Sequence, residues 1–451
     1  MKLPVDKLVN GAIWTAGAFS ISQALRFVTN IVLARLLAPE LFGLMVIVNT
    51  VRLGTELISD IGINQNIVYS KNSDDPQFYN TAWSLQVIRS VILWMFIAIA
   101  AIPIARLYDI KQLSTILVIS GLGTVFVGLT SVSIPILEKR MQFYKLNVFT
   151  IVTSAFASAV LILFAYLSPT IWALVFGALV GSAFNMIRSH YLITEVKQRF
   201  YINKEYVAEI MGFGKWIFLS SIVFFFAGNF DRLYFGKVVP LGLLGIYGIA
   251  RNISDLFGAV ATRIGGVVVF PFIASHFSTP REILRKELSS IRLKFLLLMA
   301  IGCSVLIATA DLAIKLLYDS RYHAATWILP ILVVGAWFSM IAAINESTIL
   351  GLGKPSYTAL ANGVRLVLLL IALPLSFAIA GLVGSVITLA VIEAFRNVPM
   401  YVGLRREGFG FGVQDLSVTL IMFAMTGVLE WARWTGGVGT SFDSLFASLP
   451  K

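Results

Sequence analysis

Charged residues recur at helical spacing inside the long apolar runs of this sequence. Arg52, Glu56 and Asp60 follow one another at intervals of four residues, which places their side chains on one face of a helix. Arg251 and Asp255 show the same spacing in a second run. A charge in the middle of a membrane-buried helix costs about 2.5–3.5 kcal/mol, so such residues normally face a cavity or an opposite charge. The spacing therefore predicts polar surfaces inside a helix bundle.

Three further arginines, Arg26, Arg89 and Arg365, have no acidic residue at matching spacing on their own helices. Either an acid on another helix pairs with each of them, or they line a hydrated cavity. A guanidinium group keeps its charge and binds phosphate through a planar fork of N–H donors. We therefore predict a basic site for a phosphate-bearing headgroup, formed by Arg26, Arg52, Arg89, Arg251, Arg263 and Arg365.

Acidic residues in the same runs are candidates for proton coupling or gating, because a carboxylate in a membrane cavity can take up and release a proton. The alternative is that acids near an arginine, such as Glu393, form neutral pairs that merely permit insertion. Asp231 and Arg232 are adjacent and cannot share a helix face, so we predict a structural role for them. The residues predicted to couple or gate are Glu56, Asp60, Asp255 and Glu346.

The elements that must position these charges are long apolar helices. Of the 451 residues, 58% are hydrophobic and only 13% are charged, whereas a soluble domain carries about 25% charged residues. A membrane-spanning helix needs about 20 apolar residues. Twelve runs qualify and a thirteenth, weaker run follows at 413–432, so we predict an all-α polytopic membrane protein. The twelve runs are 11–34, 43–69, 79–104, 113–136, 146–167, 171–192, 216–236, 242–273, 293–314, 325–350, 356–379 and 382–402.

The distribution of lysine and arginine predicts the orientation. Loops on the side of the N-terminus hold roughly three times as many of these residues as the opposite loops, and one such loop includes Arg285, Lys286 and Arg292. Because basic loops stay in the cytoplasm, we expect a cytoplasmic N-terminus. The C-terminus lies outside if the thirteenth run crosses the membrane and inside if that run lies on the surface, and the sequence leaves both open.

The two halves of the chain resemble each other. Residues 33–48 (LARLLAPELFGLMVIV) match 235–250 (FGKVVPLGLLGIYGIA) at one constant offset. Six spans per half give both halves the same orientation, which predicts two pseudo-symmetric six-helix bundles around a central cavity, followed by up to two further helices. The predicted domains are an N-terminal bundle at 1–192, a cytoplasmic linker at 193–215, a C-terminal bundle at 216–402 and an extension at 403–451.

Several classes of function are disfavoured. The sequence has no P-loop motif for ATP, its three histidines (His190, His276 and His323) lie far apart, and its only cysteine is Cys303, so we expect no metal and no cofactor. The net charge of +12 is explained by basic loops, so we expect no nucleic-acid partner. No loop is long enough for a soluble catalytic domain, and we predict that the protein is not an enzyme.

Four segments in order carry a family resemblance: Leu33–Val48, Ser59–Lys71 (SDIGINQNIVYSK), Leu137–Asn147 (LEKRMQFYKLN) and Phe213–Ala250, which contains NFDRLYFGKVVPLGLLGIYGIA. Together they resemble the Wzx-type oligosaccharide and polysaccharide flippases, in the subgroup of colanic-acid and succinoglycan exporters. This subgroup belongs to the multidrug/oligosaccharidyl-lipid/polysaccharide exporter superfamily. The resemblance extends over about residues 1–402, and the short C-terminal tail departs from members with fourteen spans.

The resemblance implies a bacterial inner-membrane flippase that works by alternating access. Its substrate would be an undecaprenyl-pyrophosphate-linked oligosaccharide repeat unit, moved from the cytoplasmic to the periplasmic leaflet, with the arginines above binding the pyrophosphate. The implied partners are this lipid-linked oligosaccharide, membrane lipid, and a polysaccharide polymerase and chain-length regulator. A lipid II-type flippase and a multidrug/cation antiporter of the same superfamily are the alternatives.

Overall fold

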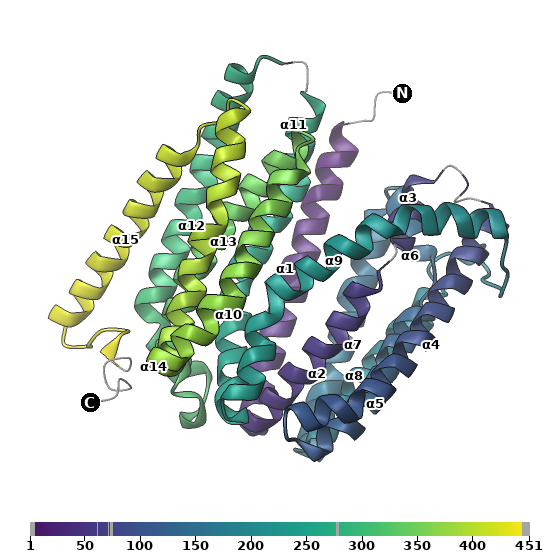
Figure 1. The fold of residues 1–451 in the computed structure, drawn as a ribbon, viewed down its shortest axis with the longest axis horizontal. Coiled ribbons are helices and arrows are strands. Elements are labelled where there is room, and N and C mark those ends of the chain that lie inside the picture. Colours follow the sequence, from purple (N-terminus) through teal and green to yellow (C-terminus); the bar gives the residue numbers. More distant parts are fainter. Residues whose placement is uncertain (1–4, 61, 71, 73–74, 277–278, 444–451) are drawn as a thin grey trace. The chain divides into compact units, whose positions relative to one another are not determined.

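The computed structural model describes residues 5–443 apart from 61, 71, 73–74 and 277–278, and it describes no side chains at 5–13, 16 and 212–220. Every regular element within those ranges is a helix (Figure 1). Among the described residues, eleven helical segments are long and apolar enough to cross a bilayer. The chain forms two compact units, residues 1–225 and 226–451. The boundary between the two units, after residue 225, falls within α9. This helix begins earlier, at Lys204, inside the predicted linker 193–215.

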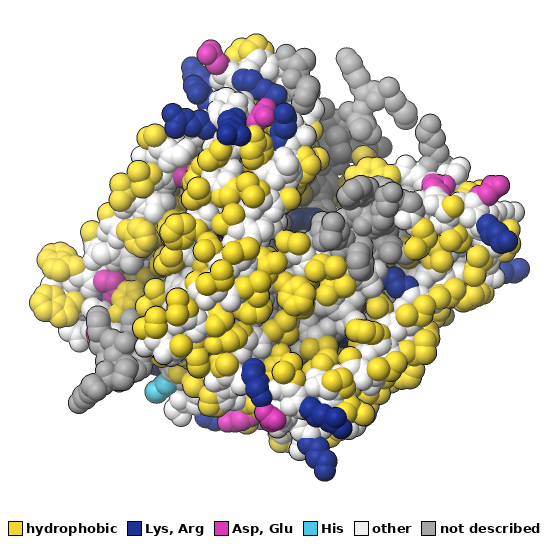
Figure 2. Space-filling view, viewed as in Figure 1, with side chains coloured by type: hydrophobic (Ala, Val, Ile, Leu, Met, Phe, Trp, Pro, Cys, Tyr) yellow, Lys and Arg dark blue, Asp and Glu magenta, His cyan; other side chains and the backbone are white. Residues whose placement is uncertain are grey.

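The surface of each unit has the distribution of side chains that a bilayer requires. Hydrophobic side chains cover the flanks of the helices, and lysine, arginine and acidic side chains gather toward helix ends (Figure 2). Large apolar residues such as Phe96, Ile99 and Leu316 are 60% or more exposed. In water such a surface would aggregate, whereas in a bilayer it faces lipid. The prediction of an all-α polytopic membrane protein is confirmed.

Unit 1 is a bundle in which α5 packs against α2, α4 and α8, and α7 packs against α1 and α8. Its helices are α1 (Val5–Leu36), α2 (Pro39–Ile58), α3 (Ile63–Tyr69), α4 (Pro76–Leu107), α5 (Lys111–Gly128), α6 (Ser133–Lys139), α7 (Phe143–Leu167), α8 (Ile171–Ser189) and the first part of α9 (Lys204–Val238).

Two runs predicted as single spans are interrupted in unit 1. The run 43–69 divides into α2 and α3, and the run 113–136 divides into α5 and α6. At the first break Gly62 adopts a left-handed conformation (φ 68°), and its N–H donates to Asp60 Oδ1 at 3.0 Å. Both features are typical of a turn and not of a continuing helix. The predicted spans are therefore too long at these two places.

An apolar cluster holds the two short helices in place. Ile63 and Ile67 of α3 pack with Ile136 and Leu137 of α6 and with Phe78 at the start of α4. At the same end of the unit, the Tyr206 hydroxyl of α9 donates to Asp75 Oδ2 at 2.6 Å, and this hydrogen bond raises the pKa of Tyr206. The breaks are thus fixed by packing, and they leave polar turn residues facing the interior of unit 1.

Unit 2 is organised around α13. In the most apolar stretch of α13, 78% of the residues are buried, compared with 11–44% in the corresponding stretches of the other candidate spans. α13 packs against α10, α12 and α14, and α12 also packs against α15. The elements of unit 2 are the second part of α9, α10 (Leu241–Ile264), the π-helix η1 (Gly265–Val269), α11 (Phe270–Ser275), α12 (Arg281–Leu317), the 3-10 helix η2 (Ser320–Tyr322), α13 (Ala325–Gly351), α14 (Pro355–Arg406) and α15 (Gly412–Thr435).

The helix boundaries support the internal repeat. The helix ends Leu36 and Val238, and the helix starts Pro39 and Leu241, are separated by the same offset of 202 residues. This offset aligns the α1–α2 joint of unit 1 with the α9–α10 joint, as the sequence match between 33–48 and 235–250 predicts.

The long α14 consists of two helices joined at Ala380 and Gly381, between the predicted spans 356–379 and 382–402. Gly381 has φ 59° and ψ −146°, a backbone conformation almost restricted to glycine. A Cβ on Gly381 would meet no atom within 4 Å, so the cost of a side chain there comes from the backbone alone. The joint therefore depends on glycine for its backbone angles.

We expect Gly381→Ala to lower the free energy of unfolding by about 1–3 kcal/mol, because alanine is strained at these angles. The matched control is Gly363→Ala on the same helix, where a Cβ also meets nothing within 4 Å but the backbone angle is ordinary. Alanine at a helical position should be neutral or stabilising by up to about 1 kcal/mol. Thermal unfolding of both purified variants measures the difference, and equal melting temperatures would contradict the prediction.

The weak thirteenth run forms α15, which lies alongside α12 and is joined to it near both ends. Arg292, in the first third of α12, and Asp415, near the start of α15, form an ion pair with an Nη2–Oδ2 distance of 2.6 Å. Nearer the ends of both helices, Arg433 of α15 lies 2.8 Å from Asp311 of α12. The earlier residue of α12 pairs with the earlier residue of α15, so the two helices run parallel. The length of α15 therefore matches the part of α12 that crosses the bilayer.

The position of Arg292 corrects the sequence analysis, which placed it in a cytoplasmic loop. Its side chain is 0% exposed, and that of Asp415 is 2% exposed. The guanidinium donates to both Asp415 carboxylate oxygens and to Asn345 Oδ1 at 2.8 Å, and it lies 4.7 Å from the centre of the Phe411 ring. Tyr401 donates to the same carboxylate at 2.9 Å. This buried network fixes α15 to α12, α13 and α14.

We expect the C-terminal end of α15 to lie on the membrane side where α12 ends. Cys303 is the only cysteine and is buried, so a Cys303→Ala background allows single-cysteine labelling. A membrane-impermeant maleimide should label Val438→Cys and Ser320→Cys from the same side of the membrane, and Arg285→Cys from the other side. Labelling of Val438→Cys together with Arg285→Cys would show that α15 lies on the surface.

Candidate functional site

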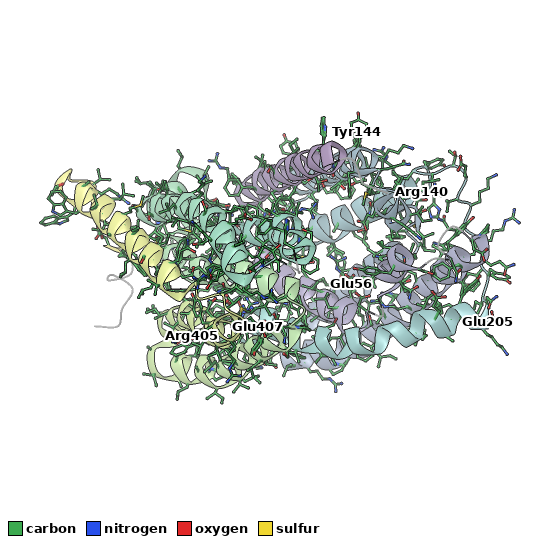
Figure 3. The ribbon with its side chains drawn as sticks, turned by 90° about the horizontal axis from the view of Figure 1, so that it is seen from above. Glu56, Arg140, Tyr144, Glu205, Arg405 and Glu407 are labelled. Atoms are coloured by element: carbon green, nitrogen blue, oxygen red, sulfur yellow. The ribbon has the colours of Figure 1, made fainter. Side chains whose placement is uncertain are left out.

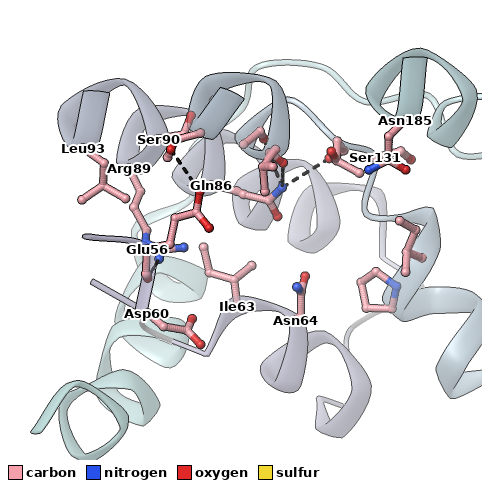
Figure 4. A pocket seen from close by; sticks show the side chains of 16 residues that line it. Glu56, Asp60, Ile63, Asn64, Gln86, Arg89, Ser90, Leu93, Ser131 and Asn185 are labelled. Atoms are coloured by element: carbon pink, nitrogen blue, oxygen red, sulfur yellow. Dashed lines mark hydrogen bonds between the residues drawn. The ribbon is translucent and has the colours of Figure 1, made fainter. Parts of the chain in front are cut away.

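Unit 1 contains a polar pocket of about 290 Å³ at the level of the two helix breaks (Figure 4). Its walls come from α2, α3, α4, α5, α6 and α8, so no single sequence segment defines it. The lining residues are Glu56, Asp60, Ile63, Asn64, Gln86, Arg89, Ser90, Leu93, Thr124, Val127, Gly128, Thr130, Ser131, Ile134, Pro135 and Asn185.

Glu56 and Arg89 anchor one side of this pocket. Arg89 donates to the Ser59 hydroxyl at 2.8 Å and to the backbone carbonyl of Glu56 at 2.6 Å. Glu56 Oε1 accepts from Thr124 Oγ1 at 3.0 Å and lies 3.8 Å from Arg52 Nη1. Figure 3 shows Glu56 among the helices of unit 1. The predicted stripe of charges on α2 and the turn after it thus faces the interior of unit 1.

Gln86 fixes the turn on the opposite wall, and the sequence analysis missed this residue. Its amide nitrogen donates to the backbone carbonyls of Val127, Gly128 and Thr130 at 3.1–3.3 Å. These carbonyls lie at the end of α5, where the helix leaves them without partners. A glutamine among apolar residues carries no distinctive spacing, so only the break in the 113–136 run could have indicated this role.

In unit 2, Asp255 pairs with one arginine of α9 and one of α10. Asp255 lies 3.0 Å from Arg251 Nε and 3.1 Å from Arg232 Nη2. Asp231 accepts a hydrogen bond from the hydroxyl of the buried Tyr247. Asp231 and Arg232 thus take part in different contacts, as their adjacency on a helix requires.

A second chain of ion pairs crosses the two parts of α14. Arg365 of the first part lies 2.5 Å from Glu393 of the second part. Arg396 lies 3.7 Å from Glu393 and 3.1 Å from Glu346 of α13. With Asp231 included, four carboxylates and four guanidinium groups take part in these contacts of unit 2, so their formal charges cancel, although Asp255 is 45% exposed. The cavity beside Arg251, Asp255 and Glu393 measures only about 20 Å³, which is room for about one water and far too little for a headgroup.

Among the described residues, the six predicted arginines divide into those that lie within 4 Å of a carboxylate (Arg52, Arg251 and Arg365) and those that do not (Arg26, Arg89 and Arg263). Arg251 and Arg365 form ion pairs with carboxylates, which is the first of the two alternatives raised for an arginine such as Arg365. Arg26 and Arg263 are exposed, and neither forms an ion pair or hydrogen bond within the part of the chain that the structure describes. Arg89 bonds to a hydroxyl and a carbonyl but to no carboxylate.

The fold and these buried charges define a polytopic α-helical membrane protein with polar interiors. Solved structures share this fold. The lipid II flippase MurJ in an inward closed conformation matches with a TM-score of 0.75, 14% identity and 92% coverage of both chains. An inward-facing MATE multidrug-resistance transporter matches with a TM-score of 0.67 and 14% identity, covering 92% of this chain and 99% of its own.

A family model described as "Polysaccharide biosynthesis protein" matches residues 32–326, and the chain belongs to this family. Relatives include the lipopolysaccharide biosynthesis protein WzxC of Escherichia coli (19% identity, covering 92% of this chain and 84% of the relative). A putative O-antigen transporter of Shigella flexneri is 22% identical and covers 84% and 94%. The succinoglycan biosynthesis transport protein ExoT of Rhizobium meliloti is 24% identical over 57% of this chain and 52% of its own length.

Proposed function

We propose that this protein is a flippase for polyprenyl-pyrophosphate-linked oligosaccharide repeat units, moving them from the cytoplasmic to the periplasmic leaflet of a bacterial inner membrane. The family match supports the substrate class, and so do the names of two relatives that align over most of their length, a lipopolysaccharide biosynthesis protein and a putative O-antigen transporter. The observation that carries the proposal is the combination of lipid-exposed helix flanks with charged and polar residues inside both units. A protein that only anchored itself in lipid would gain nothing from these buried charges.

The physical problem is the headgroup. Sugars and pyrophosphate cannot cross hydrocarbon without losing hydrogen bonds to water, at a cost of several kcal/mol for each unsatisfied group. Polar groups of the protein replace those bonds while the prenyl tail stays in lipid, and alternating access changes the side that is open. Outward movement of negative charge is favoured by an inside-negative potential, by about 2.3 kcal/mol per charge per 100 mV.

Within this proposal, the arginines without a carboxylate partner bind the pyrophosphate. Arg26 and Arg263 meet this condition among the described residues, whereas Arg89 lines a pocket with Glu56 and Asp60, and Arg52 lies 3.8 Å from Glu56. Arg251 and Arg365 are less suited, because each already pairs with an acid. Asp255 and Glu346 each form an ion pair with an arginine, which suits a gate that opens and closes by exchanging such contacts.

The proposal places the N-terminus in the cytoplasm, on the basis of the lysine and arginine distribution. A polymerase and a chain-length regulator would act on the translocated repeat units in the periplasm. No catalytic step is assigned to the chain itself.

A double variant, Arg26→Gln/Arg263→Gln, tests the proposal in cells that depend on this protein for polysaccharide export. We expect export to fall at least about tenfold, with lipid-linked precursor accumulating and membrane abundance unchanged, because losing one charge-assisted contact costs about 1.5–3 kcal/mol. The control, Arg285→Gln/Arg406→Gln, removes the same charge at exposed helix ends. Equal export by both double variants would contradict the arginine assignment.

A lipid II flippase is the second candidate, and the fold shared with MurJ favours it. Expression in cells depleted of their lipid II flippase separates the two, and we expect no rescue. A multidrug antiporter is the third candidate. We expect no gain in drug resistance on expression, because the exposed arginines would repel cationic drugs.

A further inference from the structure

We propose that the pocket of unit 1 binds one sugar ring of the translocated headgroup. This inference rests on the proposed function and adds a recognition site to it. The pocket volume of about 290 Å³ lies at the lower limit of small-molecule sites, which measure ~300–1,000 Å³. It is large enough for a single polar ring and too small for a whole oligosaccharide.

The hydrogen-bonding groups of the pocket suit a neutral ligand with many hydroxyl groups. Glu56 Oε2 and Asp60 Oδ2 are free acceptors, and the side-chain amides of Asn64 and Asn185 make no hydrogen bond to the described residues. A sugar hydroxyl both donates and accepts, so it can bond to each of these groups. Figure 4 shows Glu56 and Asn64 facing the open centre of the pocket.

The walls between these polar groups are apolar. Ile63, Leu93, Val127 and Pro135 line the pocket beside the acids and amides. A sugar ring presents C–H groups on its faces and hydroxyls at its edge, so a pocket of this mixed character covers both. The guanidinium of Arg89 is held by Ser59 and by the Glu56 carbonyl, which fixes a charged donor at the pocket wall.

Other ligands fit less well. Two carboxylates and one arginine give the lining a net negative charge, which disfavours pyrophosphate. No group of three or more His, Cys, Asp or Glu side chains in the described chain could hold a metal ion, and the sodium probe below tests binding through the other oxygens of the pocket. The pocket therefore assigns Glu56 and Asp60 to sugar recognition in place of ion coupling.

The test is thermal unfolding of the purified full-length protein. The probe is the free repeat-unit oligosaccharide released by mild acid from the cell's own lipid-linked precursors. We expect this oligosaccharide to raise Tm by about 2–4 °C, because a ligand that binds only the folded state stabilises it. Two further probes test other ligands. Inorganic pyrophosphate tests for anion binding, and sodium chloride, with choline chloride as its control, tests for sodium binding.

Two variants remove the site in different ways: Asn64→Leu/Asn185→Leu deletes polar contacts, and Leu93→Trp fills the pocket. The control is Gln65→Leu, which changes an exposed residue next to Asn64 that does not line the pocket. We expect the Tm shift to vanish in whichever site variants fold, as judged by their melting without ligand, and to persist in the control. No shift in the wild type, an equal shift in all variants, or a shift with sodium or pyrophosphate alone that the site variants abolish would overturn the inference. Export by the wild type in cells, measured separately, would leave the flippase proposal standing in each of those cases.

Discussion

Replacing Asp415 with leucine is expected to lower the free energy of unfolding by about 3–5 kcal/mol, the largest effect on stability that we predict. The substitution leaves the guanidinium of Arg292 buried without its carboxylate, with the hydrogen bond to Asn345 and the contact with the Phe411 ring as partial compensation. Removing one partner of a buried pair costs far more than removing both, because the remaining charge loses its compensation. Denaturant or thermal unfolding of the purified variant in detergent measures this loss.

The double variant Arg292→Met/Asp415→Leu separates charge from packing. It should recover most of the lost stability, since no isolated charge remains. The control is Lys354→Met, which breaks the exposed Lys354–Glu407 pair (3.2 Å) and should cost less than about 1 kcal/mol. If Asp415→Leu melts like this control, the buried network does not hold α15 in place.

Replacing Glu393 with leucine should have a similarly large effect on stability and should also act on export. Glu393 lies 2.5 Å from Arg365 and 3.7 Å from Arg396, so its loss leaves Arg365 without an acid and Arg396 with Glu346 alone. We expect destabilisation of about 3–5 kcal/mol. We also expect less export per molecule of the variant that remains in the membrane, because these ion pairs join the two parts of α14 to each other and to α13.

A double variant distinguishes a structural role from a functional one. Arg365→Met/Glu393→Leu removes both charges of the closest pair, so it should restore much of the stability. We expect its export to stay low, measured per molecule in the membrane. Export that recovers together with stability would show that the pair only supports folding.

The spans could be predicted because the requirement for about 20 apolar residues acts on one segment at a time. The division of α14 at Gly381 and the presence of α15 agree with that prediction. The break at Asp60 and Gly62 was missed, although both residues favour turns, since the surrounding run is apolar enough to read as one helix.

Partners on different helices could not be predicted from spacing. Arg292 and Asp415 are 123 residues apart, and nothing in the sequence near either residue indicates the other. The same holds for Arg365 and Glu393. From sequence alone, Arg365 has no acidic partner on its own helix, and Glu393 lies near a different arginine. The pocket of unit 1, including Gln86, could not be predicted either, because its lining residues come from several helices that share no sequence pattern. Residue types along one helix predict that a polar face exists but do not identify its neighbours.

Translocation by the purified protein in liposomes tests the central claim most directly. Vesicles would contain a fluorescently labelled polyprenyl-pyrophosphate oligosaccharide in the inner leaflet, and appearance of the sugar in the outer leaflet would be followed with a membrane-impermeant sugar-binding lectin. We predict movement that requires the protein and is strongly reduced in Arg26→Gln/Arg263→Gln. Transfer no faster than in protein-free vesicles, from correctly folded protein, would contradict the flippase account.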